Sequence, residues 1–306
     1  MNDKTLIEEM ASGVEGVAPV PPRVEVVELR RYSLDELEQR IERFLDMTAE
    51  AFSLPLKHRD WAVHNDRTVI RMPLKAHATV YHASGAMKLV TGLKPMASLF
   101  KKVEERSRLV ELVKETTDRL NIREWVGQNE SLAFERLWQI KAAAADRKNR
   151  AVEPVLCRVV GAYRHFVGEL PVWGAASIAV KLASEGTLDS LAVQVRASTG
   201  KVIDRVEVLR PEQAARQIFL QLGRLMGESK IPISEIATPR WLRFGYLSLS
   251  KRKAQTVLAP VYVAAMEIMG QQVRQAYLFV VPATEKSYLP LPNGIEASPT
   301  PLRGAA

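Results

Sequence analysis

The sequence predicts an α+β protein made of two similar halves, in each of which an antiparallel sheet packs on amphipathic helices. Short segments rich in Val, Ile, Thr and Tyr recur between residues 24 and 281, as strands require. Apolar residues keep helical spacing in at least three longer segments. A strand, a small Ala-Ser-Gly turn, a second strand and a proline-marked helix occur twice, around residues 83–85 and 197–200.

In the first half, Ser33 and Glu36 form a capping-box pattern that predicts the start of a helix. The apolar spacing that follows extends this helix over residues 34–52. A strand is predicted just before it, at residues 24–29. The remaining predicted elements are strands at 61–63, 68–74, 78–82 and 87–90, a long helix over 97–121 and a third helical stretch over 131–148.

In the second half, strand-like sequence returns after Pro154, and Pro211 and Gly227 mark the two ends of a helix. Residues 241–281 have the pattern of a three-stranded meander. The other predicted strands are 155–163, 177–182, 191–195 and 202–208.

These elements predict a division of the chain into domains. Glycine and proline in residues 10–23 indicate a flexible leader over 1–22, followed by a first domain at 23–148. A polar linker at 146–153 precedes a second domain at 154–285. Residues 286–306 are predicted to be a proline-rich, extended or disordered tail.

Composition sets the broad class. The chain has 306 residues, 47% hydrophobic and 25% charged, with a formal net charge of +8, which favours anionic partners without identifying them. Its one cysteine, Cys157, lies in strand-like sequence and is interpreted as a buried structural thiol. Neither an apolar run of about 20 residues nor a signal-peptide pattern is present, so we expect a cytoplasmic protein without a membrane span. The alternative is an extracytoplasmic protein whose signal peptide has been removed.

No catalytic motif is recognisable, and we therefore assign no catalytic, metal or cofactor residues. The sequence has no HExxH, GxGxxG, GxxxxGK[ST] or GxSxG pattern, and its histidines are not spaced as a helical metal site requires. We expect all five histidines, His165 among them, to be solvated or at the edge of the core. An enzyme would have to use scattered residues of the first half: His58, His64, His82, Glu25, Asp60 and Arg71.

Two segments are candidate binding surfaces. Residues 239–253 combine basic and aromatic side chains without an acid, a composition that suits single-stranded nucleic acid. The alternative is that its aromatic residues face the core and its basic residues form a solvated turn. The candidates here are Arg240, Trp241, Arg243, Tyr246, Lys251, Arg252 and Lys253. The second segment, 163–174, contributes Arg164 and Trp173.

The second segment also carries a family resemblance. Its residues Tyr163-Arg164, Gly168 and Leu170-Pro171-Val172-Trp173-Gly174 are followed by strand, glycine, strand and the turn at 198–200. This order resembles the PepSY and FTP propeptide domains of thermolysin-type peptidases, over about residues 155–281. The alanine-bearing helix at 211–215 and the segments 245–246 and 258–262 are similar to later parts of such proteins. The resemblance implies an antiparallel sheet curled over a helix and a non-catalytic role as inhibitor, folding aid or regulatory partner.

The predicted function is therefore that of a non-catalytic regulatory or accessory protein that binds a peptide or protein, with an acidic partner expected. An open sheet edge would accept an extended peptide as an added strand. Two alternatives stay open at this point: an enzyme with a scattered site in the first half, and a nucleic-acid-binding protein that acts through residues 239–253. No cofactor is expected, and the oligomeric state is not predicted.

Overall fold

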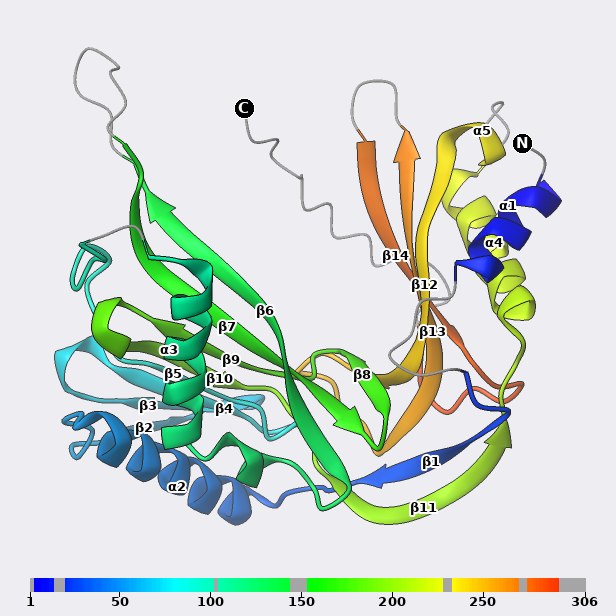
Figure 1. Ribbon diagram of the computed structural model, residues 1–306. Helices are drawn as coiled ribbons and strands as arrows, with labels where there is room; N and C mark the ends of the chain where they lie inside the picture. Colours follow the sequence, from blue (N-terminus) through cyan, green and yellow to red (C-terminus); the bar gives the residue numbers. More distant parts are fainter. Residues whose placement is uncertain are drawn as a thin grey trace.

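The computed structural model describes residues 3–13, 20–101, 104–143, 153–227, 233–269 and 274–291. Helices and a large, mostly antiparallel sheet of 14 strands make up the fold, so the α+β class is confirmed (Figure 1). The strands follow the order β11-β1-β13-β12-β8-β7-β9-β10-β5-β4-β3-β2, with β14 added beside β13 and β6 beside β7. Two large hydrophobic cores lie along this sheet.

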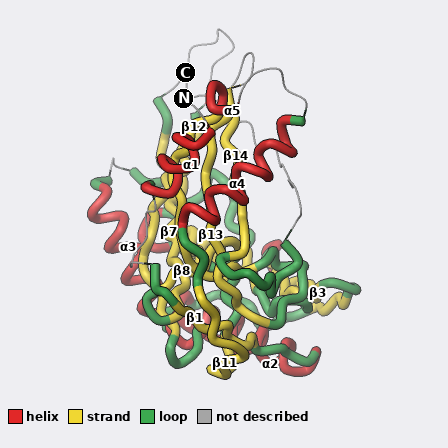
Figure 2. The backbone as a smooth tube through the Cα atoms, turned by 90° about the vertical axis from the view of Figure 1, so that its right-hand side faces the viewer, coloured by secondary structure: helices red, strands yellow, loops and turns green. Residues whose placement is uncertain are grey.

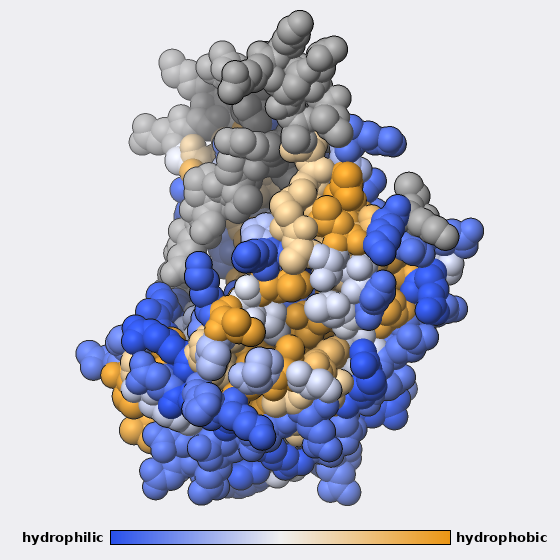
Figure 3. Space-filling model, turned by 90° about the vertical axis from the view of Figure 1, so that its left-hand side faces the viewer, coloured by the Kyte–Doolittle hydropathy of each residue, from blue (hydrophilic) through white to orange (hydrophobic). Residues whose placement is uncertain are grey.

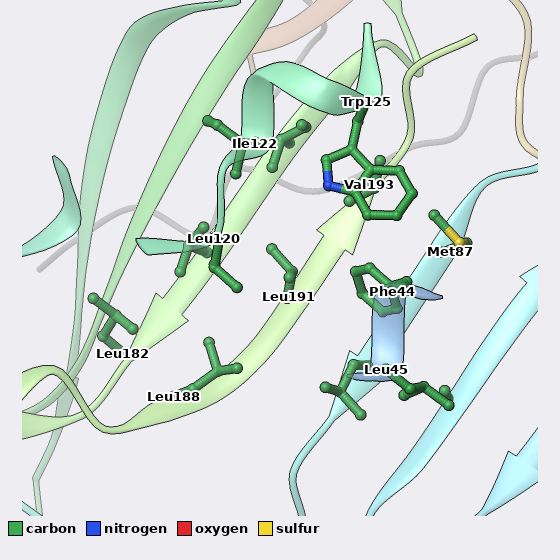
Figure 4. Packing of buried hydrophobic residues seen from close by; sticks show 14 of the residues in the cluster. Phe44, Leu45, Met87, Leu120, Ile122, Trp125, Leu182, Leu188, Leu191 and Val193 are labelled. Atoms are coloured by element: carbon green, nitrogen blue, oxygen red, sulfur yellow. The ribbon is translucent and has the colours of Figure 1, made fainter. Parts of the chain in front are cut away.

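The first core lies where α2 and α3 pack on one face of the strands from β6 and β7 to β2 (Figure 1). Figure 4 shows its centre, where Phe44 of α2 lies near Trp125 and near Met87 of β5. The helical elements here are α2 (Leu34–Phe52), α3 (Arg106–Arg119), η1 (Pro73–Lys75), η2 (Ile122–Trp125) and η3 (Ser184–Gly186). The strands are β2 (Asp60–Val63), β3 (Arg67–Arg71), β4 (His77–Tyr81), β5 (Met87–Val90), β6 (Glu130–Ala142), β7 (Val155–Val167), β9 (Ser177–Leu182) and β10 (Leu188–Val193).

The second core lies between β12–β14 and the helices α1 and α4, which lie side by side over these strands (Figure 2). The meander predicted at 241–281 is confirmed, since β12, β13 and β14 pair antiparallel in succession. The helices are α1 (Asp3–Ser12), α4 (Pro211–Met226) and α5 (Ile233–Ile236). The strands are β1 (Arg23–Leu29), β8 (Leu170–Gly174), β11 (Ser198–Glu207), β12 (Ala237–Ser248), β13 (Val257–Met269) and β14 (Arg274–Pro282).

Helix α2 begins and ends where the sequence predicts. The side chain of Ser33 accepts a hydrogen bond from the Glu36 amide, and the Glu36 carboxylate accepts one from the Ser33 amide. The apolar residues at helical spacing are buried against the sheet: Leu37, Ile41, Phe44 and Leu45. The helix ends at Ser53, whose backbone is left-handed. Helix α4 likewise matches the segment predicted between Pro211 and Gly227.

Three sequence predictions of secondary structure in residues 1–148 were wrong. Residues 3–12 form helix α1, in which Leu6 and Met10 are buried, so this part of the predicted leader is folded. The helical stretch predicted at 131–148 is instead strand β6, which pairs with β7 along most of its length. The long helix predicted at 97–121 is limited to α3, Arg106–Arg119.

The two cores do not follow the predicted division of the chain near residues 146–153. The first core takes residues from 37 to 137 and again from 156 to 195. The second core takes residues from 10 to 29 and again from 172 to 283. Ala142 pairs with Val155, so the segment between them connects two neighbouring strands of one sheet. Most of that segment, and residues 292–306 of the predicted tail, lie outside the described residues.

A turn of unusual conformation occurs twice, once in η1 between β3 and β4 and once in η3 between β9 and β10. The middle residues, Leu74 and Glu185, are left-handed with φ of 58° and 57°. The next residues, Lys75 and Gly186, also have positive φ, at 66° and 71°. The elements that follow differ, because β4 pairs with β5 as a hairpin whereas β11 leaves β10 and pairs with β1. The prediction of a turn at 198–200 was wrong, because these residues begin strand β11.

Cys157 is 5% exposed and buried, as predicted. Among the described residues, no helix is long and apolar enough to cross a membrane.

Figure 3 shows the side of the molecule that lies on the left of Figure 1. Hydrophobic and weakly polar side chains gather in the middle of that side, and hydrophilic ones lie below them and along the right edge.

Candidate interaction site at the junction of the two cores

Trp173 occupies the place where the strands of the two cores meet. It lies on β8, which pairs antiparallel with the end of β7 and parallel with β12. The indole is only 9% exposed and donates a hydrogen bond to the Phe244 carbonyl at 3.1 Å. A Cβ at Gly245 would lie 2.6 Å from the indole nitrogen and 2.3 Å from the Pro171 carbonyl oxygen. Glycine is therefore required at 245 for β8 and its tryptophan to approach β12.

Two guanidinium groups stack on this indole. The Arg164 guanidinium carbon lies 4.5 Å from the ring centroid and that of Arg243 lies 5.5 Å from it. Arg243 also stacks on Trp241, at 4.6 Å. Such contacts contribute about 0.5–2 kcal/mol each, depending on their exposure. We name the set formed by Arg164, Trp173, Arg243 and Trp241 the arginine–tryptophan row.

The row is anchored on its β6 side by a carboxylate. Arg164 donates to Glu135 at 2.6 Å and to the Val172 carbonyl at 3.1 Å. The side chains of Arg164 and Glu135 are 20% and 28% exposed, so their pairing is partly shielded from water. The row joins β7, β8 and β12, and Glu135 connects it to β6. It unites four of the nine candidate residues predicted from two separate segments.

The other basic candidates belong to different places. Arg240 pairs with Glu267 near the start of β12. Lys251 stacks on Tyr81 at 4.4 Å, and Arg252 pairs with Asp66 at 3.1 Å. Arg240, Lys251 and Arg252 therefore each contact a group of the protein itself.

The aromatic residues of the same segment are largely buried. Phe244 is 2% exposed and Tyr246 is 3% exposed. Burial raises the pKa of Tyr246, whose hydroxyl donates to the Glu25 carbonyl at 2.8 Å. The faces of Phe244 and Tyr246 are therefore not exposed for stacking on nucleic-acid bases, whereas Trp241 is half-buried.

Arg196, which sequence reasoning did not single out, holds the turn at 249–253 in place. It is 5% exposed and donates to the carbonyls of Ala83 at 3.2 Å, Ser250 at 3.1 Å and Lys253 at 2.7 Å. Burial lowers the pKa of Arg196 to about 10. The group thus links the β4–β5 turn of the first core to the β12–β13 turn of the second.

A second buried group missed by the sequence is the pair of Glu130 and His165. His165 is completely buried, so its expected place at the surface or core edge was wrong. Its Nε2 lies 2.9 Å from Glu130 Oε2, and its Nδ1 is buried without a hydrogen-bond partner. Glu130 also accepts hydrogen bonds from the amides of Gly127 at 2.8 Å and Ser198 at 2.7 Å. No spacing in the sequence signals this contact, since its members lie on β6, β7 and β11.

The residues considered for a scattered catalytic site are not brought together as one group. His58, Asp60 and Arg71 line a surface hollow of about 450 Å³. His82 instead bonds to Thr68 within the sheet, and Glu25 pairs with Arg205 on β11. In the part of the chain that the structure describes, no three His, Cys, Asp or Glu side chains are grouped as metal ligands.

Comparisons with known proteins support the fold alone. No family model matches the chain. No curated protein matches it either. An uncharacterized protein from Eubacterium rectale has a similar crystal structure, with a TM-score of 0.53 and 10% sequence identity. The match covers 87% of this chain and 86% of that one, so the similarity extends over both cores.

Proposed function

We propose that this protein is a non-catalytic accessory protein that binds an extended segment of an acidic peptide or protein along the open edge of β6. The observation that carries the proposal is the strand itself. Among the described residues β6 pairs with β7 alone, and it is 13 residues long. An uncovered edge of this length presents unpaired backbone donors and acceptors to a further strand.

Two large side chains on β6 support the same proposal. Trp138 is 45% exposed and Ile140 is 43% exposed. They lie two residues apart, with no register shift between them, and therefore on the same face of the strand. Exposed aromatic and aliphatic side chains next to an open edge provide the apolar contacts that give an added strand its specificity.

The charge around β6 favours an acidic partner. Arg136 and Lys141 are exposed on the strand, and Arg136 stacks on Trp138 with its guanidinium carbon 5.5 Å from the ring centroid. The one exposed acid of the strand, Glu135, is paired with Arg164. A partner with carboxylates would meet uncompensated positive charge here, which accelerates association and fixes register.

The two similar halves of the predicted fold, and the PepSY-like resemblance, belong to this proposal. The shared left-handed turns at Leu74 and Glu185 support a duplicated scaffold. The strand order ends at β2 on one side and at β11 on the other, so each half contributes one end of the sheet. A doubled scaffold of this kind suits a platform for partners.

The proposal is tested by selecting binders from a displayed library of random peptides. Selected peptides are expected to be enriched in acidic residues and to bind less tightly, by at least about tenfold, after Trp138→Thr with Ile140→Thr. Threonine keeps the preference for strand structure while removing the apolar surface. The matched control is Met269→Thr with Leu278→Thr, which removes side chains that are 52% and 69% exposed on β13 and β14.

Site-specific evidence comes from amide NMR with a selected peptide. Contacts between peptide amides and the β6 backbone are expected, as an added strand requires. If no peptide is enriched, or if the β6 variant and the control lose affinity equally, the proposal is wrong.

A further inference from the structure

A pocket on the first core, separate from β6, is built around three arginines. It lies between the first half of α2 and η2 and has a volume of about 310 Å³. This is at the lower end of the range for small-molecule sites and well above the space that a bare ion needs. Its lining residues are Arg30, Tyr32, Glu36, Gln39, Arg40, Arg43, Glu124 and Trp125.

The walls of the pocket are fixed by the surrounding structure. Trp125 is 5% exposed and packs edge-on against Phe44, with the ring centroids 5.7 Å apart (Figure 4). Tyr32 lies so close to Gly85 that a Cβ there would be 3.0 Å from its ring. The capping box holds Glu36 at the start of α2. The site is therefore preformed, which reduces the entropy lost when a ligand binds.

Arg40 differs from the other two arginines of the pocket. Arg43 forms an ion pair with Glu124, and Arg30 lies 3.4 Å from Glu36. The Arg40 guanidinium instead lies 4.8 Å from the centroid of the Tyr32 ring and 5.0 Å from that of Trp125. Its Nε is buried without an acceptor, and it forms no ion pair with any described carboxylate.

The environment of Arg40 disfavours its charge in the absence of a ligand. Burial, and then the positive charges of Arg30 and Arg43, lower the pKa of Arg40. A buried donor without an acceptor is costly, and so is a partly desolvated cation without a counter-charge. Ring contacts engage the face of a guanidinium and leave the N–H groups at its edge available for a planar anion.

We propose that this pocket binds a small organic anion through its carboxylate or phosphate group, with Arg40 as the principal donor. The oxyanion accepts hydrogen bonds from the edge of the Arg40 guanidinium, in the paired geometry that arginine favours. Arg30 and Arg43 add positive potential, and the rest of the ligand lies against Tyr32 and Trp125. The three arginines outnumber the two carboxylates, Glu36 and Glu124, so the lined space keeps a positive balance.

Calorimetric titration tests the proposal with two probes. Citrate represents a carboxylate ligand and inorganic phosphate represents a phosphate ligand, so the two titrations distinguish these groups. At least one probe is expected to bind the wild-type protein and to bind Arg40→Met at least about tenfold more weakly. Arg31→Met is the matched control, because Arg31 is an exposed neighbour that does not line the pocket. Its affinity is expected to stay within about twofold of the wild-type value.

Thermal unfolding distinguishes a binding residue from a purely structural one. Without ligand, Arg40→Met is expected to melt close to the wild-type temperature, because removal of an unpaired buried donor offsets the loss of the two ring contacts. With citrate or phosphate, the melting temperature is expected to rise for the wild type and Arg31→Met, but not for Arg40→Met.

The Nε–Hε NMR signal of Arg40 gives a readout that needs no variant. It is expected to shift when the protein is titrated to about 10 mM probe, some ten times a millimolar Kd. The proposal is overturned if this signal stays in place with both probes, or if Arg40→Met binds them as tightly as the wild type does.

Discussion

At the scale of single residues, the carboxylate of Glu130 joins segments that are far apart in the chain. It accepts hydrogen bonds from the amides of Gly127 and Ser198 and lies 2.9 Å from His165 Nε2. Burial alone would raise the pKa of Glu130, but His165, Ser198 and Gly127 outweigh it and lower the pKa to about 2. The ionised carboxylate is therefore a net stabilising group.

This shift predicts a pH-dependent stability. The unfolded carboxylate has its ordinary pKa of 4.5, so the unfolded chain takes up the proton first as the pH falls. The stabilisation is complete above pH 4.5 and is lost as the pH falls through the lowered pKa of the folded state. Urea unfolding of Glu130→Gln should therefore show a loss of about 3–5 kcal/mol at pH 7, as for other broken buried pairs, and a shrinking difference from the wild type below pH 4.5.

Glu169→Gln is the control for this prediction, because Glu169 is exposed in the turn between β7 and β8. It should leave the free energy of unfolding within about 0.5 kcal/mol of the wild-type value. A difference between wild type and Glu130→Gln that stays constant from neutral to acidic pH would contradict the assignment.

At the scale of elements, the repeated left-handed turn has a residue with a Cβ at one position of the first turn and a glycine at the equivalent position of the second. Lys75 has φ of 66° and is exposed. Gly186 has φ of 71° and, because it lacks a Cβ, adopts this conformation without a steric clash. The left-handed region costs a residue with a Cβ about 1–2 kcal/mol. At this second left-handed position the backbone is thus strained in the first turn and unstrained in the second.

Substitution at these two positions should move stability in opposite directions. Lys75→Gly should raise the free energy of unfolding by about 0.5–1 kcal/mol, after the extra entropy of glycine in the unfolded chain is counted. Gly186→Ala should lower it by about 0.5–1 kcal/mol, because the entropy that alanine saves in the unfolded chain offsets part of the strain. Chemical unfolding of both variants tests this, and a change of the same sign in both would contradict the shared conformation.

The elements also show which predictions a sequence supports. Helix α2 was predicted with its bounds because the capping box at Ser33 and the apolar spacing are local signals. Strand β6 was predicted as a helix because its alanines, glutamates and leucines favour helices, while its actual conformation comes from pairing with β7. Pairing with a distant strand is a non-local effect that overrides such preferences.

The candidate site, too, was predictable from local sequence only in part. Arg164, Trp173, Trp241 and Arg243 were found from their types, because basic and aromatic residues in one segment stand out. That they form one row depends on the parallel pairing of β8 with β12, which no local signal predicts. Arg40 and Arg196 were missed because each acts through neighbours far along the chain or through backbone carbonyls.

At the scale of the whole molecule, Arg196 couples the two cores. Its guanidinium bonds to Ala83 in one turn and to Ser250 and Lys253 in another. Arg196→Met should cost about 3 kcal/mol, because the carbonyls of these turns lose a charged donor. Hydrogen exchange should become at least about tenfold faster in both turns, 81–85 and 249–253.

The control for this variant is Arg67→Met, since Arg67 lies in β3 and takes no part in the contact with Ser250 and Lys253. Faster exchange in only one of the two turns would show that Arg196 supports a turn and does not link the cores.

The topology also sets an order of events during synthesis. Arg23 of β1 bonds to Glu207 of β11, 184 residues later, and α1 packs on α4, which begins at Pro211. At about 5–20 residues per second, the ribosome needs roughly 10–40 s to deliver those partners. The first core is complete once residue 195 has emerged, whereas the second core needs residues up to 283. We therefore expect the first core to fold while α1 and β1 are still unpacked. Their apolar residues should stay exposed, and accessible to chaperones, until the last strands of the second core have been synthesised.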